Sequence, residues 1–250
     1  MAKQISSGVI YRGPSLIDGK QIVVIGVYPE KRVNRKTGAA VQTYILRDNE
    51  NKPSENNKTG EDAAICGNCK HKGTPNNNPN KKNATGRTCY VQFSGVHAVW
   101  RKYNAGGYPT LTANQIIELG CGRFVRMGSY GDPLAAPYPV WQGLLADSVG
   151  HACYTHQDAS INPSTARLCI KSADSIGDLS QSARTFRIIP VSEYKQHGKQ
   201  VLTKDEILCP ATIEGGNKTN CQFCGLCNGQ TNKGKSIAVV AHGIARNLIK

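Results

Sequence analysis

The densest run of cysteines lies near the C-terminus, in CPATIEGGNKTNCQFCGLCNG (209–229). Cys221, Cys224 and Cys227 repeat with a period of three, and Cys209, which precedes a proline, lies upstream. Overlapping Cys-x2-Cys pairs with a further Cys-Pro are typical of segments that bind a cubane iron–sulfur cluster, because closely spaced thiolates can each reach a different iron. Zinc sites also use Cys-x2-Cys pairs. The pattern favours one centre, a 4Fe-4S cluster or Zn²⁺, with a disulfide or free thiols as the remaining alternative.

A second cysteine set lies in the first half of the chain, where Cys66-Gly-Asn-Cys69 is followed by Cys89. Three thiols leave the fourth ligand position of a metal site unassigned, and two explanations are possible. Either His71 or His97 completes a structural Cys3His zinc site, or three cysteines hold a cluster and leave one corner open for reaction. The fourth ligand therefore decides whether this centre is structural or catalytic.

The N-terminus has no apolar core of a signal peptide. The longest apolar run, IVVIGVY (22–28), is far shorter than the roughly eighteen residues of a spanning helix. We therefore expect a soluble, cytoplasmic protein without a membrane partner, whose ten cysteines stay reduced. Metal binding is favoured over a disulfide framework on that basis. Three cysteines lie in or beside predicted core segments and are expected to be buried and inert: Cys121, Cys153 and Cys169.

The charge balance favours a polyanionic partner. The chain has 31 Lys and Arg against 17 Asp and Glu, which gives a formal net charge of +14 and a sequence pI near 9.4. Such an excess most often indicates nucleic acid, DNA or RNA. The alternative is a generally basic, solvated surface, because the lysines are not concentrated on one predicted helix.

Four regions follow from the distribution of cysteines and apolar runs. They are an N-terminal β-strand region (1–60), a Cys-rich metal-binding loop (61–93), an alternating β/α core (94–208), and a Cys-rich segment with a final strand (209–250). The stretch 70–86 is too rich in Asn, Lys, Pro and Gly to pack, so we expect a mobile loop between Cys69 and Cys89.

Strand and helix patterns alternate after Ser94, and a hairpin or a pair of short strands precedes them. We expect helices over 94–107, 112–120, 137–149 and 175–183, and strands over 22–29, 41–47, 124–128, 151–157, 167–172, 184–191 and 236–243. Strands separated by helices predict βαβ units and a parallel sheet. The expected fold is α/β, either an open sheet or an incomplete (β/α) barrel.

Polar residues recur where these strands end. In parallel α/β folds the carboxyl ends of the strands and the loops after them form the site. We therefore expect five side chains to share one cleft near the Cys66 centre as candidate catalytic residues: Asp132, His156, Asp174, Arg187 and His242. The alternative is that Asp132 caps a helix, Asp174 closes a turn and Arg187 forms a surface ion pair.

Several strings in this order are similar to a bacteriophage family related to gene product eighty-eight: CGNCKHKG, CYVQFSGVHAVWRKY, VRMGSYGDP, RTFRI and the cysteine segment 209–229. The resemblance spans most of the chain and implies a phage origin and action in the cytoplasm of a bacterial host. It implies no particular activity. A weaker likeness is to radical S-adenosylmethionine enzymes, although here the third cysteine, Cys89, lies farther away than in their usual motif.

Three hypotheses follow. The first is an iron–sulfur enzyme that acts on or with nucleic acid. The second is a zinc-stapled nucleic-acid-binding protein without catalysis. The third is a modulator of a host protein.

Overall fold

The computed structural model describes residues 4–30, 33–179, 183–229, 234–243 and 246–249. Within these residues the chain has mixed α/β structure, with two five-stranded sheets. All described strand pairs of the second sheet are parallel, and so are two of the four described strand pairs of the first sheet. The expected α/β class with parallel strands is confirmed, and the described strands do not close into a barrel.

The first sheet combines a meander with parallel strands. Its strands, in spatial order, are β1 (Ser7–Pro14), β2 (Gln21–Val27), β3 (Ala40–Arg47), β4 (Phe124–Tyr130) and β5 (Gly150–Ala152). β1, β2 and β3 pair antiparallel, whereas β3, β4 and β5 pair parallel. The apolar run Ile22–Ile25 in β2 is fully buried, which places this strand inside the fold.

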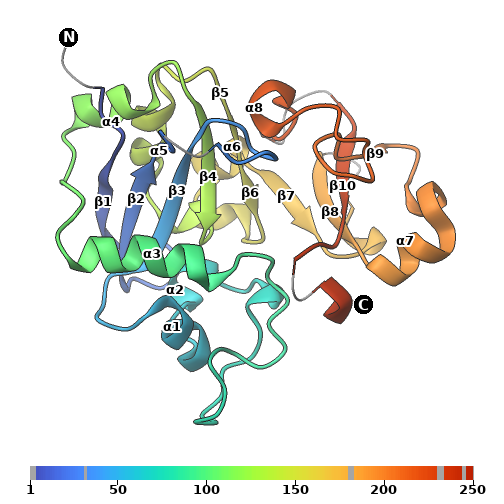
Figure 1. The fold of residues 1–250 in the computed structure, drawn as a ribbon, viewed down its shortest axis with the longest axis horizontal. Helices are drawn as coiled ribbons and strands as arrows, with labels where there is room; N and C mark the ends of the chain where they lie inside the picture. The colour runs from blue at the N-terminus through green and yellow to red at the C-terminus, as the bar shows by residue number, and fades with distance from the viewer. Residues whose placement is uncertain (1–3, 31–32, 180–182, 230–233, 244–245, 250) are drawn as a thin grey trace.

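The second sheet is entirely parallel. Its strands are β6 (Tyr154–Thr155), β7 (Ile170–Ala173), β8 (Thr185–Ile189), β10 (Ser236–Val240) and β9 (Glu206–Leu208), in that spatial order. Only Cys153 separates β5 from β6, so one stretch of chain belongs to both sheets. The strands therefore run as a continuous curved layer from β1 to β9 (Figure 1).

Eight α-helices lie within the described residues. They are α1 (Pro53–Thr59), α2 (Ala63–Cys66), α3 (Phe93–Asn104), α4 (Ala113–Gly120), α5 (Tyr138–Leu145), α6 (Pro163–Leu168), α7 (Val191–His197) and α8 (Cys221–Cys224). Helix α4 begins at a capping box, because Thr112 accepts from the Gln115 amide and Gln115 Oε1 accepts from the Thr112 amide. None of the described helices is long and apolar enough to cross a bilayer.

The sequence patterns predict β2, β3, β4, β7, β8, β10, α3, α4 and α5, and the expected strand over 151–157 forms β5 and β6. They do not assign β1, β9, α1, α2, α6, α7 or α8. Two further segments differ from expectation. The expected helix over 175–183 is only the 3-10 turn η4 (Ile176–Asp178), and residues 180–182 lie outside the described residues. The polar stretch 70–86 folds back on itself, with a bridge between Thr74 and Thr85 and a bond from the Ala84 amide to Asn57 Oδ1. Asparagine side chains satisfy its backbone, which composition alone did not indicate.

Candidate metal centres around one cavity

One face of the curved sheet lines a cavity of about 210 Å³. On β4, Arg126, Gly128 and Tyr130 point into it, while Val125 and Met127 point to the opposite face and are buried in the core. The same alternation places Phe186 and Ile188 of β8 on the cavity side, among other members of a largely apolar wall.

The N-terminal cysteine set, Cys66, Cys69 and Cys89, lines this cavity. Cys66 ends α2, and the Cys69 amide donates to the Cys66 carbonyl at 3.1 Å. The Cys89 amide returns to the His71 carbonyl at 2.9 Å, which closes the intervening loop. Gly67 has a φ of +48°, and a Cβ there would overlap the Gln157 amide, so the turn within Cys-x2-Cys requires glycine.

Ionisation of these thiols is opposed by their surroundings. Burial raises the pKa of Cys66 well above its ordinary value, and Asp62, Cys69 and Cys89 raise it further. Burial likewise raises the pKa of Cys89, against the effect of Arg87. A bound cation would reverse this balance, because a coordinated thiol loses its proton.

The C-terminal cysteine set, Cys209, Cys221, Cys224 and Cys227, lines the same cavity. Helix α8 supplies two of the thiols and is capped by Asn220, whose side chain accepts from the Phe223 amide at 3.2 Å. The Cys209 amide donates to Ala238 of β10 at 2.8 Å, so the sheet holds the start of the segment.

The C-terminal set lies against the amino ends of β3 and β4. Cys221 and Cys227 pack on Ala40, Phe124 and Ala152. At the opposite end of β4, the Asp132 amide donates to the carbonyl of Ile65, next to Cys66. The seven residues of β4 span roughly 20 Å, which sets the approximate separation of the two sets along the cavity.

The spacing of the sulfur atoms bears on which metal fits. Tetrahedral zinc with Zn–S bonds of about 2.3 Å needs sulfurs about 3.8 Å apart. Among the described residues, no three cysteine sulfurs lie within 4.8 Å of one another. The donor type suits a soft metal in both sets, either zinc or an iron–sulfur cluster.

Three of the five predicted strand-end residues line the cavity: Asp132, His156 and His242. Asp132 follows β4, and its carboxylate accepts from Thr155 Oγ1 at 2.9 Å, from the His156 amide at 3.0 Å and from the Leu134 amide at 3.1 Å. The last bond caps the 3-10 turn η2 (Pro133–Ala135). Asp132 therefore fixes the backbone that presents His156.

Arg187 does not reach the cavity. Its guanidinium forms a two-pronged pair with Glu206 of β9 at 2.7 and 2.8 Å and donates to the Val201 carbonyl. Both side chains are almost fully buried, with 2% and 0% exposure. Because Phe186 and Ile188 point into the cavity, Arg187 between them must point away. The prediction that Arg187 lies at the site is therefore wrong, because Arg187 forms a buried ion pair on the opposite face of the sheet.

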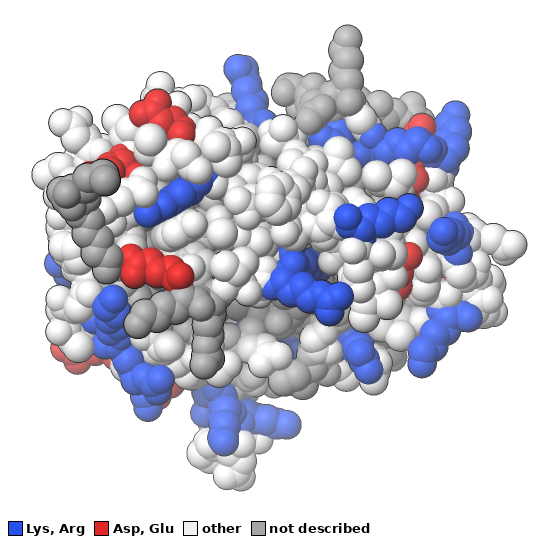
Figure 2. All heavy atoms as spheres, turned by 45° about the horizontal axis from the view of Figure 1, so that its top comes forward, with Lys and Arg blue, Asp and Glu red and all other residues white. Residues whose placement is uncertain are grey.

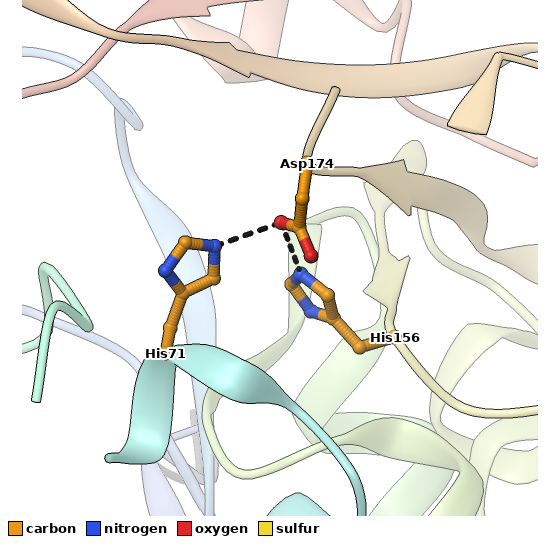
Figure 3. A group of neighbouring side chains, drawn as sticks. All are labelled: His71, His156 and Asp174. Atoms are coloured by element: carbon orange, nitrogen blue, oxygen red, sulfur yellow. Dashed lines mark hydrogen bonds and ion pairs between the residues drawn. The ribbon is translucent and has the colours of Figure 1, made fainter. Parts of the chain in front are cut away.

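His71, His156 and Asp174 form a cluster that the sequence did not identify as a unit (Figure 3). Asp174 Oδ1 lies 2.8 Å from His71 Nε2 and 3.4 Å from His156 Nε2. Burial lowers the pKa of His156, but hydrogen bonds with Asp174 and Cys69 outweigh it and raise the pKa to about 10. Burial raises the pKa of Asp174, and the two imidazoles outweigh that effect and lower it.

The contacts of the histidines also show which imidazole lies near the N-terminal set as a possible fourth ligand. His71 turns its Nε2 towards Asp174 and its Nδ1 towards Thr88, 2.7 Å away. His97 lies on α3, stacked on Phe93, and is not part of the cavity wall. His156 contacts Cys69 instead. The two histidines expected from sequence are therefore directed elsewhere, and a third imidazole is the neighbour of the thiols.

A polar bridge of four side chains, Tyr90, Arg126, Lys36 and His242, lies between the two cysteine sets. Tyr90 stacks on His242 with ring centres 5.3 Å apart, and its hydroxyl accepts from Arg126. His242 Nε2 lies 3.1 Å from Lys36 Nζ. No sequence pattern predicts contacts among these residues, because they come from four separate segments of the chain.

The three remaining cysteines differ from expectation. Cys153 and Cys169 are buried as predicted but are joined as a disulfide. Cys121 is exposed. The disulfide adjoins the C-terminal set, because the Cys153 amide donates to the Cys227 carbonyl at 3.0 Å.

Comparison of the chain with protein-family models, curated proteins and solved structures finds no match. The resemblance to a phage family therefore stays a prediction from the sequence strings.

Proposed function

We propose that this chain is a metal-dependent enzyme, an iron–sulfur protein in which the C-terminal set holds a 4Fe-4S cluster and the N-terminal set holds a reactive centre. The observation that supports it is the convergence of seven cysteines, from segments more than a hundred residues apart, on one cavity. Purely structural metal sites have no need to share a cavity. The curved layer is interpreted as an incomplete barrel around that cavity.

The C-terminal set suits a cluster for two reasons. It offers four thiols, and it has cations beside it: burial raises the pKa of Cys221 on balance, but Arg126 and Lys36 both lower it. An iron–sulfur cluster with four thiolates is an anion that such groups stabilise.

The N-terminal set suits a reactive centre because it has three thiols and polar neighbours. An iron–sulfur centre with an open position would supply electron transfer or Lewis-acid chemistry there. His156 is placed to hold or give a proton, with Asp174 behind it to orient the imidazole. Asp132 holds the backbone of His156 in position through its amide.

The cavity wall indicates what kind of group enters. Tyr154 and Phe186 lie with ring centres 4.4 Å apart, and Ile188, Ile237 and Val239 extend the apolar surface. Aromatic and aliphatic walls with a few polar groups bind flat, partly apolar groups well, and a nucleobase is one such group. Arg126 and Lys36 are the cations on the described cavity wall that an anionic substituent could contact.

Nucleic acid is the proposed substrate or partner because of the charge of +14. Figure 2 shows basic side chains spread across one face, where they outnumber acidic ones, rather than gathered in one patch. Binding to single- and double-stranded oligonucleotides at two salt concentrations tests this: affinity should fall with a log–log slope of roughly −0.7 to −0.9 per phosphate contact. Absence of binding to either strand form at low salt would contradict the proposal and favour a host-protein partner.

The metal proposal is tested by anaerobic purification with measurement of iron, sulfide, zinc and the visible spectrum. We expect roughly four irons for the C-terminal set and a broad charge-transfer absorption. Cys224→Ser should remove this absorption, while Cys121→Ser, which changes an exposed thiol, should keep it. Colourless protein with zinc in both sets would instead support the second function, a zinc-stapled nucleic-acid-binding protein.

A further inference from the structure

We propose that His71, His156 and Asp174 form a binding site for one divalent transition-metal ion, of the Zn²⁺ or Fe²⁺ class, separate from both cysteine sets. The three side chains come from different parts of the chain: η1 (Lys70–Lys72), the residue after β6, and the residue after β7. The inference is independent of any cofactor in the cysteine sets; with the ion bound, His156 Nε2 is a ligand and no longer carries the proton of the proposed function.

The geometry already resembles a ligand shell. His71 Nε2, His156 Nε2 and a carboxylate oxygen of Asp174 all lie within 4.8 Å of one another. A metal with bonds of about 2.1 Å to tetrahedral ligands needs donors about 3.4 Å apart. The two nitrogen-to-oxygen distances are 2.8 and 3.4 Å, so small side-chain rotations would suffice (Figure 3).

The contacts around the cluster can direct two imidazole nitrogens and one carboxylate oxygen towards a single ion. Thr88 Oγ1 lies 2.7 Å from His71 Nδ1 and can accept its proton, which leaves the lone pair on Nε2. Both Nε2 atoms face the same Asp174 oxygen, and Lys70 Nζ lies 3.4 Å from the other oxygen. An ion beside the shared oxygen would be within reach of both imidazoles.

The cluster is enclosed but reachable. The side chains of His71, His156 and Asp174 are 7%, 22% and 17% exposed. His71 and His156 line the main cavity, whereas His71, Asp174 and Thr88 line a second hollow of about 200 Å³. An ion could enter from the second hollow and present an open coordination position to the main cavity.

The donor set determines the class of ion. Two imidazoles and one carboxylate are typical of Zn²⁺ and non-haem Fe²⁺, whereas Mg²⁺ and Ca²⁺ prefer oxygen-only shells. Because His156 also contacts Cys69, the ion would lie beside the N-terminal set and could activate a water molecule there.

Co²⁺ is the probe that separates this site from the cysteines. Cobalt bound by thiolates shows strong charge-transfer bands in the near ultraviolet, whereas cobalt bound by nitrogen and oxygen shows only weak visible bands. Titration of the full chain, after its cysteine centres have been filled, should reveal one equivalent of Co²⁺ without new thiolate bands, together with a rise in Tm.

Asp174→Asn and His156→Gln should each weaken this Co²⁺ binding by about 100-fold or more, and Thr88→Val by about 10-fold through the tautomer of His71. His97→Gln and Asp158→Asn are matched controls outside the cluster and should bind as the parent does. Iron and sulfide content, measured on the same samples, reports separately on the cysteine centres. The inference is overturned if only thiolate-bound Co²⁺ is found, or if Asp174→Asn and Thr88→Val bind Co²⁺ with unchanged affinity.

Discussion

The two cysteine sets lie on one cavity, but the charges beside Cys66 differ in sign from those beside Cys221. Asp62 and Asp132 surround Cys66, and each raises its pKa beyond the effect of burial. Near the C-terminal set, Lys36 lowers the pKa of Cys209, although burial is the larger effect and raises it. Cys227 has the most apolar position: burial raises its pKa to about 12, although a hydrogen bond with Tyr154 lowers it.

This difference shows that cysteine spacing and the field around the thiols carry separate information. Lysine and arginine near the C-terminal set favour a resident anionic cofactor. Carboxylates near the N-terminal set disfavour anions, so the thiols there depend more on the positive charge of the metal itself. We therefore expect the two sets to respond differently to the loss of one thiol.

The largest expected effect is that of Cys224→Ser compared with Cys69→Ser. Loss of Cys224 should remove the C-terminal cofactor and lower the free energy of unfolding by roughly 5 kcal/mol or more, because metal binding and folding are coupled. Cys209 and Cys227 also pack with β8 and β10, so the loss should spread into the second sheet. Cys69→Ser should remove only the other metal, with a smaller fall in Tm. Equal effects of the two substitutions would remove the distinction.

Arg187→Met tests a charged residue that belongs to neither set. It leaves Glu206 buried without its partner and should cost about 3–5 kcal/mol while the metal content of both sets stays unchanged. The double variant with Glu206→Leu should recover much of that loss. Denaturant unfolding measures the change in stability, and metal analysis measures the content of both sets. A loss of metal in the folded single variant would show that Arg187 belongs to the site after all.

The same pair predicts a pH dependence. Burial raises the pKa of Glu206, but Arg187 and Thr203 outweigh it and lower the pKa below the ordinary 4.5. A depressed folded pKa means that the pair stabilises the protein above pH 4.5 and that this contribution is lost as the pH falls through the folded pKa. The double variant should therefore lose less stability between neutral and acidic pH than the parent does. Parallel pH curves for the two proteins would contradict this.

Cys169→Ala should have an intermediate effect. The Cys153–Cys169 bond closes a loop of 16 residues, for which the chain-entropy model gives about 3 kcal/mol. Because Cys153 donates to Cys227, we also expect weaker cofactor retention in the C-terminal set but not in the N-terminal set. Cys121→Ser, which changes an exposed thiol, is the control, and its free energy of unfolding should change by no more than about 0.5 kcal/mol. Unchanged unfolding on loss of Cys169 would show that the thiols are not paired in the folded protein.

The smallest effect is expected for Tyr90→Phe. The change removes the hydroxyl that Arg126 contacts but keeps the ring stacked on His242. One hydrogen bond to a charged group at an exposed position is worth about 1 kcal/mol or less. Both metal centres should be retained, and thermal unfolding should show only a small decrease in Tm. If either centre is lost, the polar bridge is part of that centre.

Elements with strong local patterns could be predicted from the sequence. The β-branched runs over 22–29 and 41–47 became β2 and β3, and the Thr112 cap became the start of α4. The helix expected over 175–183 was wrong in type for its described part, because only a short turn forms there. Its apolar positions are too few to bury a helical face.

The candidate site could be predicted only in part. Asp132, His156 and His242 follow strands and line the cavity, because parallel strands bring their ends to one level. Arg187 shows the limit of that reasoning, since a position within a strand is assigned to a face only when the face of its neighbours is known. Arg126 escaped notice for the same reason.

The sequence by itself determined the two cysteine sets, their Cys-x2-Cys spacing, the excess of positive charge and the presence of parallel strands, because these depend on residue identity and on local periodicity. Only the tertiary structure decided that both sets face one cavity, that His71 turns to Asp174 rather than to the thiols, and that Cys153 meets Cys169. Those contacts join residues that are distant in sequence. Their geometry depends on how the strands and loops pack in three dimensions, which no local sequence pattern encodes.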